Sequence, residues 1–243
     1  MNLELKNEFL QKWRKYFGEK AELPITFWYS KNRVQKEEIA PKAWMCLMGQ
    51  LGKVRKGQNL SFSAESISCG GGKAYCGFAP IIPGLPEFLS TGKERYLKTP
   101  ELAKKAIDQF PVFKAPEKYI TFKRWDELTE EDEPEVVFFF ATPDVLSGLF
   151  TLANYDQSNP FGNMAPFSSG CGSIITYPYQ EKEKENPKAF IGMFDPSARP
   201  FVPENSLSFA VPMKKFETMI ANMDESFLTT PDWDKVKKRM ERA

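Results

Sequence analysis

Two of the four cysteines lie in glycine-rich turns, where residue types and spacing could support chemistry. Cys69 is followed by three glycines in SISCGGGKAYCGF (66–78), and Cys171 is flanked by glycines in SSGCGSII (168–175). At a helix amino terminus, unpaired backbone N–H groups lower the pKa of a thiol, and glycine lets backbone amides approach an anion closely. The sequence therefore predicts a ligand-binding site, and its candidate residues are Cys69, Gly70, Gly71, Gly72, Cys171, Gly172 and Arg199. The alternative is that each cysteine is a small buried residue beside a tight turn.

A thiolate-ligated metal or iron-sulfur cluster is a second interpretation of the same residues. Its four ligands would be Cys46, Cys69, Cys76 and Cys171. Cys69 and Cys76 are seven residues apart, which puts them on one face if a single helix holds both. The chain has no C-x2-C pair, so such a site would have to be assembled by tertiary folding. Cys46 itself is predicted to lie in an apolar helix and to be core.

The segment MFDPSARP (193–200) places an aspartate and an arginine within one turn. The guanidinium of Arg199 could bind a carboxylate or phosphate, since arginine offers a planar fork of donors. The alternative is a β-turn with a local ion pair between Asp195 and Arg199. Glu65 precedes the Cys69 turn and is the nearby carboxylate that could serve as a base.

Composition excludes several classes of function. The 243 residues include no histidine, so a Ser/His/Asp triad, a Cys/His pair, an HExxH zinc site and a histidine proton shuttle are all excluded. The net charge of +1 gives no extended basic surface, which argues against nucleic-acid binding. The glycines match neither a Walker nor a Rossmann motif. The charged amino-terminal segment and the lack of a long apolar run predict a cytoplasmic protein without a membrane span.

The predicted elements describe an α+β fold that holds these residues. Helices are expected over 3–17, 42–55, 100–109, 143–155, 212–223 and 231–242, with shorter ones opening near Gly70 and Ser168. Strands are expected over 24–30, 59–63, 119–125, 135–141, 189–194 and 206–211, and an acidic surface stretch over 126–135. The alternation is irregular, so we expect a largely antiparallel or mixed sheet with packed helices in one domain, residues 1–243. Residues 1–20 would form a docking helix and 231–243 a carboxy-terminal helix, and the two Cys-Gly segments hint at a pseudo-twofold repeat.

An ordered set of segments resembles a known family. The segments are WMCLMGQLGKVRKG, ESISCGGGKAYCGF, PEVVFFFATPD, SSGCGSII, MFDPSAR and SLSFAVP, and they span about Ile25 to Leu228. In this order they are similar to the uncharacterised family DUF169 (domain of unknown function 169). The resemblance implies a single domain in which cysteines matching Cys46, Cys69 and Cys171 recur. It also implies a further cysteine ahead of Arg199, which this chain lacks, and it assigns no reaction.

Three hypotheses follow, and none of them names a cofactor, a reaction or an oligomeric state. The first is a cytoplasmic protein that binds a small anionic ligand or cofactor in a pocket lined by the Cys-Gly turns. The second is the thiolate-ligated metal or iron-sulfur protein. The third is a non-catalytic interaction module whose core thiols are inert.

Overall fold

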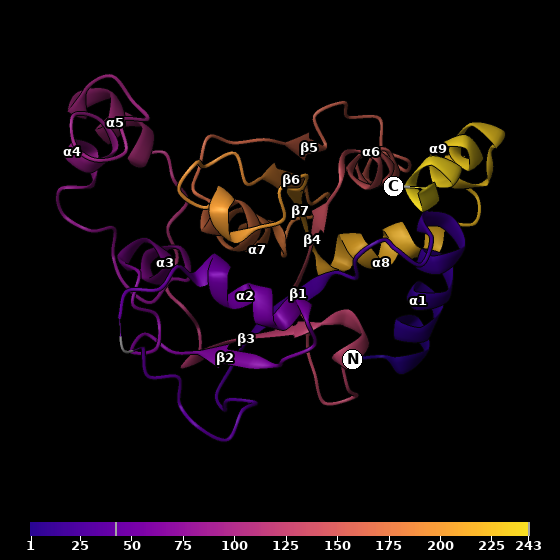
Figure 1. Cartoon of the computed structure of the whole chain (residues 1–243), viewed down its shortest axis with the longest axis horizontal. Coiled ribbons are helices and arrows are strands. Elements are labelled where there is room, and N and C mark those ends of the chain that lie inside the picture. The colour runs from indigo at the N-terminus through magenta and orange to yellow at the C-terminus, as the bar shows by residue number, and fades with distance from the viewer. Residues whose placement is uncertain (42, 243) are drawn as a thin grey trace.

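The computed structural model describes residues 1–41 and 43–242, and its centre is one mixed sheet (Figure 1). The strands are β1 (Ile25–Ser30), β2 (Leu60–Phe62), β3 (Tyr119–Arg124), β4 (Val136–Ala141), β5 (Asn163–Met164), β6 (Ala189–Gly192) and β7 (Leu207–Pro212). They are ordered β2-β3-β1-β4-β7-β6-β5, and every pairing is antiparallel except the parallel pair of β5 and β6. The predicted α+β class with a largely antiparallel or mixed sheet is therefore confirmed.

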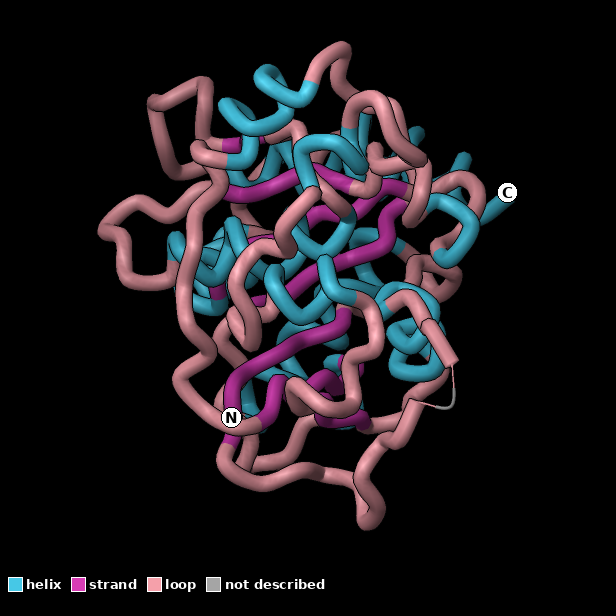
Figure 2. Tube along the Cα trace, turned by 90° about the vertical axis from the view of Figure 1, so that its left-hand side faces the viewer, coloured by secondary structure: helices cyan, strands magenta, loops and turns pink. Residues whose placement is uncertain are grey.

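Helices cover both faces of the sheet, as the view in Figure 2 shows. One face carries α1 (Leu3–Phe17), α6 (Pro143–Ala153), α8 (Met213–Asn222) and α9 (Pro231–Arg242). The other carries α2 (Leu47–Arg55), α3 (Gly70–Tyr75), the π-helical turn η2 (Gly172–Thr176) and α7 (Tyr177–Glu181). The strands alternate between the two cores: Val137 and Phe139 face the first, while Val136 and Phe138 face the second. Both Cys-Gly turns belong to the second face.

The remaining elements are short. They are α4 (Leu85–Leu89), α5 (Pro100–Ile107) and the 3-10 turns η1 (Trp125–Glu127), η3 (Arg199–Phe201) and η4 (Phe227–Thr229). The α4 and α5 helices pack on each other and stand away from the sheet at the left of Figure 1. Within the described ranges, no helix combines the length and the apolar character needed to cross a membrane.

Local sequence signals account for several element boundaries. α1 begins after Asn2, whose side-chain oxygen accepts from the Glu4 N–H at 2.8 Å, and it ends at Gly18 with φ +83°. α5 begins after Thr99, whose hydroxyl oxygen accepts from the Leu102 N–H, with Pro100 as its first residue. Both helices match the predicted positions within two residues.

The helix predicted over 42–55 begins later than expected, at Leu47. Lys42 lies outside the described residues, and 43–46 are not helical. The N–H of Met45 donates to the Ser68 hydroxyl at 2.8 Å, and that hydroxyl donates back to the Met45 carbonyl at 3.4 Å. Because Ser68 takes up the backbone groups of Met45, the chain stays extended until Cys46 becomes the N-cap residue of α2. The prediction that Cys46 lies inside the helix was wrong.

Each Cys-Gly turn follows one of the two edge strands of the sheet. β2 and β5 lie at opposite edges of the sheet, and each is followed within ten residues by a Cys-Gly turn. The chain returns to the second face after both strands, because Cys76 and Cys171 both belong to the same buried cluster. Two segments about 100 residues apart in sequence are thereby brought to one region.

Candidate functional site

The two Cys-Gly turns meet at the ring of Tyr75, the last residue of α3. A Cβ atom on Gly172 would lie 3.2 Å from the Tyr75 ring, and one on Gly71 would lie 3.9 Å from the same ring. The hydroxyl of Thr176 donates to the Tyr75 carbonyl at 2.9 Å, which fixes η2 against the end of α3. The ring of Tyr75 is therefore packed between the turn of Cys69 and the turn of Cys171.

The Cys69 turn also packs against the start of α2. Cys69 is the N-cap residue of α3, and its Sγ accepts from the Gly72 N–H at 3.5 Å. A Cβ atom on Gly72 would lie 3.6 Å from the Cβ atoms of both Cys69 and Leu47. Cys46 directly precedes Leu47, so the amino-terminal ends of α2 and α3 lie beside each other, each beginning after a cysteine.

Cys46 and Cys69 are half-buried, whereas Cys76 and Cys171 are buried, and all four are free thiols. Cys46 packs against the second core cluster but is itself only half-buried, so it lies at the edge of the core rather than inside it. Cys76 ends α3 rather than sharing a helix face with Cys69, and its carbonyl accepts from the Tyr29 hydroxyl at 2.8 Å.

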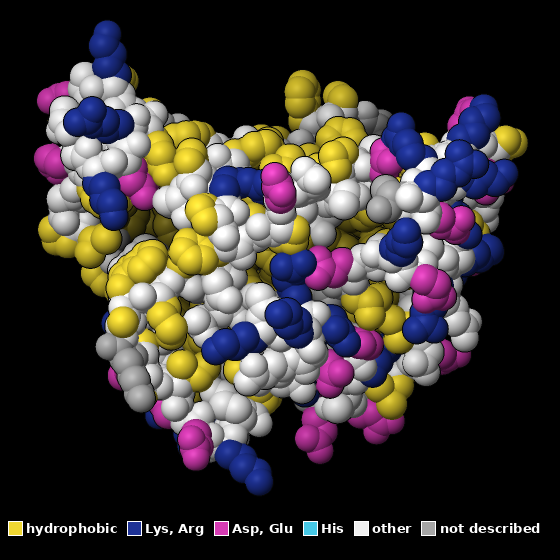
Figure 3. Space-filling model, viewed as in Figure 1, with side chains coloured by type: hydrophobic (Ala, Val, Ile, Leu, Met, Phe, Trp, Pro, Cys, Tyr) yellow, Lys and Arg dark blue, Asp and Glu magenta, His cyan; other side chains and the backbone are white. Residues whose placement is uncertain are grey.

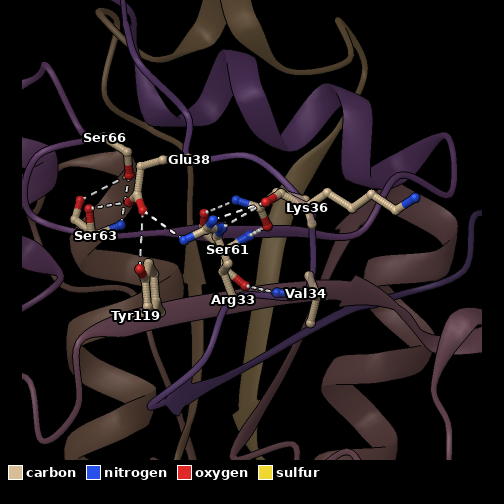
Figure 4. Close-up of polar contacts among 9 residues, drawn as sticks. Arg33, Val34, Lys36, Glu38, Ser61, Ser63, Ser66 and Tyr119 are labelled. Atoms are coloured by element: carbon tan, nitrogen blue, oxygen red, sulfur yellow. Dashed lines mark hydrogen bonds and ion pairs between the residues drawn. The ribbon is translucent and has the colours of Figure 1, made fainter.

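A polar network, drawn in Figure 4, holds the chain segment that leads to Cys46. The Glu38 carboxylate accepts from the hydroxyls of Ser63 and Tyr119 at 2.9 and 3.1 Å and pairs with Arg33 at 3.3 Å. The side-chain amide of Gln35 bonds both the N–H and the carbonyl of Ser61, at 2.8 Å each, and so pairs with edge strand β2 as another strand would. These contacts anchor residues 33–38 on the sheet, and this segment is followed by the stretch that ends at Cys46.

In the Cys171 turn, most of the backbone amides are already hydrogen-bonded. The Gly170 N–H donates to Oδ2 of Asp195 at 3.3 Å, and the Gly172 N–H donates to the Ser169 hydroxyl at 3.1 Å. A Cβ atom on Gly170 would lie 3.0 Å from the Ala198 Cβ, so the turn packs directly on the MFDPSAR segment. Asp195 is thereby placed beside the two Cys-Gly turns.

The expected β-turn is present, because the N–H groups of Ala198 and Arg199 donate to the Asp195 carbonyl at 3.1 and 3.2 Å. The side chains of Asp195 and Arg199, however, bond to different partners rather than to each other. Oδ1 of Asp195 accepts from the Tyr96 hydroxyl at 3.1 Å and from the Ser197 hydroxyl at 2.8 Å. The Arg199 guanidinium donates to the carbonyls of Glu204 (2.5 Å) and Ser206. Arg199 therefore fixes the segment that leads to β7, and its role as a ligand-binding residue stays a prediction.

Burial favours the neutral forms of the groups at the centre of the site. It raises the pKa of the Cys76 and Cys171 thiols well above the ordinary value of 9.0, and it raises the pKa of Tyr75 to about 12. The pKa of Cys46 is also raised, mainly by burial. Cys171 therefore carries a protonated thiol at neutral pH, so its glycine flanks do not make it a thiolate nucleophile.

The four-cysteine metal site gains no geometric support. Within residues 1–41 and 43–242, no group of three or more cysteine, aspartate or glutamate side chains is arranged to hold a metal ion. Glu65, the candidate base, is exposed, and its polar surroundings near Ser63 lower its pKa, so it is ionised at neutral pH. The thiolate-ligated cluster stays a prediction.

Four exposed apolar side chains lie on segments that contact the two turns or adjoin them in sequence. Ile82 contacts Gly70, with 3.2 Å from its Cδ1 to a Cβ built there, and the Phe201 ring lies 3.2 Å from the same position on Gly49. Trp44 and Phe194 adjoin Cys46 and Asp195 in sequence, and Ile82, Phe201, Trp44 and Phe194 are all exposed. We call these four residues the apolar rim. Figure 3 shows hydrophobic side chains gathered over the α3 region, where the surface is hollowed below the α4–α5 pair.

Sequence reasoning missed Tyr75 and Tyr96. Tyr75 lies within the glycine-rich segment, and its spacing of six residues from Cys69 was the available signal. Tyr96 lies in the long connection between α4 and α5, and nothing in that segment indicates a contact with Asp195 about 100 residues later.

The cysteines are expected to react with iodoacetamide in a fixed order, with Cys69 first. Its sulfur is half-buried and faces the Gly72 N–H, whereas Cys76 and Cys171 are buried and protonated. At pH 7.5, a value chosen as near neutral, Cys69 should be modified about 100-fold faster than Cys76 or Cys171. Peptide mapping by mass spectrometry after timed quenching measures the order, and equal rates for the four thiols would contradict it.

Comparison with known proteins gives one match. The family model of DUF169, described as "Uncharacterised ArCR", matches residues 15–222 of the 243. The match includes all four cysteines, Tyr75, Asp195 and Arg199. No curated protein and no solved structure matches the chain.

Proposed function

This chain belongs to the DUF169 family, and because that family is uncharacterised we propose a function from the geometry of the chain itself. We propose that the protein binds a small molecule where its two Cys-Gly turns meet. The observation that carries the proposal is the packing of both turns on the single ring of Tyr75, next to the apolar rim. Thiol, phenol and carboxylate groups from distant segments converge there, and a few such polar groups beside apolar surface can orient a bound ligand.

Backbone N–H groups and nearby apolar side chains indicate what kind of ligand would fit. The N–H groups of Gly70 and Gly71 belong to the first turn of α3, where backbone donors have no partner within the helix. Ile82 contacts Gly70, Phe201 packs on Gly49 of the neighbouring helix α2, and Trp44 lies two residues before Cys46; all three are exposed and offer apolar surface. This combination suits a ligand with an apolar or planar aromatic body and a polar end that accepts hydrogen bonds.

The charges and the occupied hydrogen-bond donors around the turns restrict how much negative charge the ligand can carry. The amides of Gly72, Gly170 and Gly172 are already hydrogen-bonded, and the Arg199 guanidinium is held by backbone carbonyls. Asp195 adds negative charge beside the turns. We therefore propose that any anionic group of the ligand is small and that the apolar body supplies most of the affinity.

Binding of the fluorescent probe anilinonaphthalene sulfonate tests the proposal, since the probe combines an aromatic body with one anionic group. The folded protein should bind it, and Phe201→Ala should weaken binding by about 5–10-fold through lost apolar contact. Phe150→Ala is the matched control: Phe150 is 41% exposed against 38% for Phe201, but it lies on α6, on the other face of the sheet.

Bound probe should also slow the alkylation of Cys69 while leaving the reaction of unfolded protein unchanged. Equal loss of probe affinity in Phe201→Ala and Phe150→Ala, or no protection of Cys69, would show that the probe binds elsewhere and would contradict the proposed site.

A further inference from the structure

We propose that Cys46 and Cys69 form a reversible intramolecular disulfide when the protein meets a hydroperoxide. This would be a redox-modification site at the start of α2 and α3. It does not depend on the small-molecule proposal, because it needs only the two thiols and an oxidant.

The first observation that carries the inference is the pairing of the residues that precede each cysteine. Met45 and Ser68 bond in both directions, with Met45 N–H to the Ser68 hydroxyl at 2.8 Å and that hydroxyl to the Met45 carbonyl at 3.4 Å. Cys46 and Cys69 are the next residues in each segment, so their main chains run close to each other. A disulfide needs Cα atoms about 4.4–6.8 Å apart, a distance that such adjacency makes accessible with small backbone shifts.

The second observation is the packing of Gly72. The point where its Cβ would stand is 3.6 Å from the Cβ of Cys69 and 3.6 Å from the Cβ of Leu47, the neighbour of Cys46. Both distances are ordinary van der Waals contacts, so the starts of α2 and α3 pack directly against each other at Gly72. Both cysteines are N-cap residues in extended conformation, with φ/ψ of −68°/134° and −80°/121°, so each side chain stands at the end of its helix.

Cys46 and Cys69 are more accessible to solvent than the other two cysteines. Cys46 and Cys69 are half-buried, whereas Cys76 is fully buried and Cys171 is 8% exposed. An oxidant in solution can reach the first pair without opening the core.

The chemistry proceeds in two balanced steps. The Cys69 sulfur, which accepts the Gly72 N–H, attacks a peroxide oxygen; the O–O bond breaks, Cys69 becomes a sulfenic acid, and the departing oxygen takes a proton to leave as alcohol or water. The Cys46 sulfur then attacks the Cys69 sulfur; the S–S bond forms, the S–O bond breaks, and the hydroxide leaves as water with the Cys46 proton. Two thiols are oxidised and one hydroperoxide is reduced.

The serine variants needed for the test should fold. Serine is among the preferred N-cap residues, so Cys46→Ser and Cys69→Ser each place a good cap at an existing helix start. The two cysteines also lie on different tryptic peptides, residues 43–53 and 57–73, so their linkage gives a new peptide pair that mass spectrometry identifies.

The experiment treats the reduced full-length protein with an equivalent of hydrogen peroxide, blocks the remaining thiols in denaturant and maps the tryptic peptides. We expect residues 43–53 joined to 57–73, reversed by dithiothreitol, with Cys76 and Cys171 recovered in blocked form. In Cys46→Ser, Cys69 should accumulate as a sulfenic acid that dimedone traps. In Cys69→Ser, oxidation of Cys46 should slow about ten-fold or more.

The inference would be overturned by a linkage that includes Cys76 or Cys171, by a link between two chains, or by no linked peptide in the wild type. It would also be overturned if Cys69 in the wild type were oxidised to sulfinic acid without the link. None of these readouts uses the fluorescent probe, so failure of this inference is distinguishable from failure of the proposed function.

Discussion

Replacing Asp132 with alanine should lower the free energy of unfolding by about 3–5 kcal/mol, because it leaves a buried lysine without its partner. Oδ2 of Asp132 accepts from Nζ of Lys123 at 2.8 Å, and the two side chains are only 7% and 9% exposed. The same oxygen accepts from the Thr129 N–H at 2.7 Å, so the carboxylate also closes the turn that leads toward β4. Denaturant unfolding measures the loss.

The double variant Lys123→Met/Asp132→Asn is the control for this ion pair. It removes both charges while asparagine keeps an oxygen for the Thr129 N–H, so it should cost clearly less than Asp132→Ala alone. A loss below about 1 kcal/mol for Asp132→Ala would mean that the lysine reaches water and that the pair behaves as an exposed one.

Tyr75→Ala is expected to have the second large effect, on both stability and thiol reactivity. Its ring contacts the turns of both Cys69 and Cys171, so truncation should leave a cavity and cost about 2–4 kcal/mol. Burial would then no longer protect the Cys171 thiol, and its alkylation should become about ten-fold faster under native conditions.

Tyr75→Phe keeps the ring and removes the hydroxyl, so it separates packing from hydrogen bonding. It should cost less than about 1.5 kcal/mol and leave Cys171 protected. If Tyr75→Phe exposed Cys171 as much as Tyr75→Ala does, the phenol hydroxyl rather than ring packing would hold the two turns together.

Much of the fold was predictable because local signals agree with the final structure. Asn2 and Gly18 bound α1, and Thr99-Pro100 opens α5, since caps act within one turn of the helix that they end. The continuous apolar run of β4 and the irregular order of helices and strands sufficed to predict an α+β sheet.

The predictions that were wrong concern residues whose environment is set by contacts between distant segments. The acidic stretch 126–135 was predicted to lie on the surface, yet Asp132 is buried, because β3 directs the Lys123 ammonium toward it. The 42–55 helix begins late because Ser68, 23 residues after Met45, occupies the backbone groups that a helix would use. Composition and periodicity carry no information about such pairings.

The candidate site, too, was predictable in part. The recurrence of a Cys-Gly turn indicated that the Cys69 and Cys171 segments could share one region, and they do meet. Three features of the site follow from tertiary packing instead. Tyr75 lies between the two turns, the Asp195 carboxylate bonds the Gly170 N–H rather than the Arg199 side chain, and Cys46 lies beside Cys69.

The convergence of the two turns on Tyr75 is best tested by nuclear Overhauser effects in protein labelled with ¹³C-glycine. One α-proton of a glycine stands where a Cβ would be, and those positions on Gly71 and Gly172 lie 3.9 and 3.2 Å from the Tyr75 ring. We predict contacts from the Tyr75 ring protons to the α-protons of both glycines. A contact with Gly71 alone, with Gly172 giving none, would show that the turns are separate in solution and would contradict a shared site.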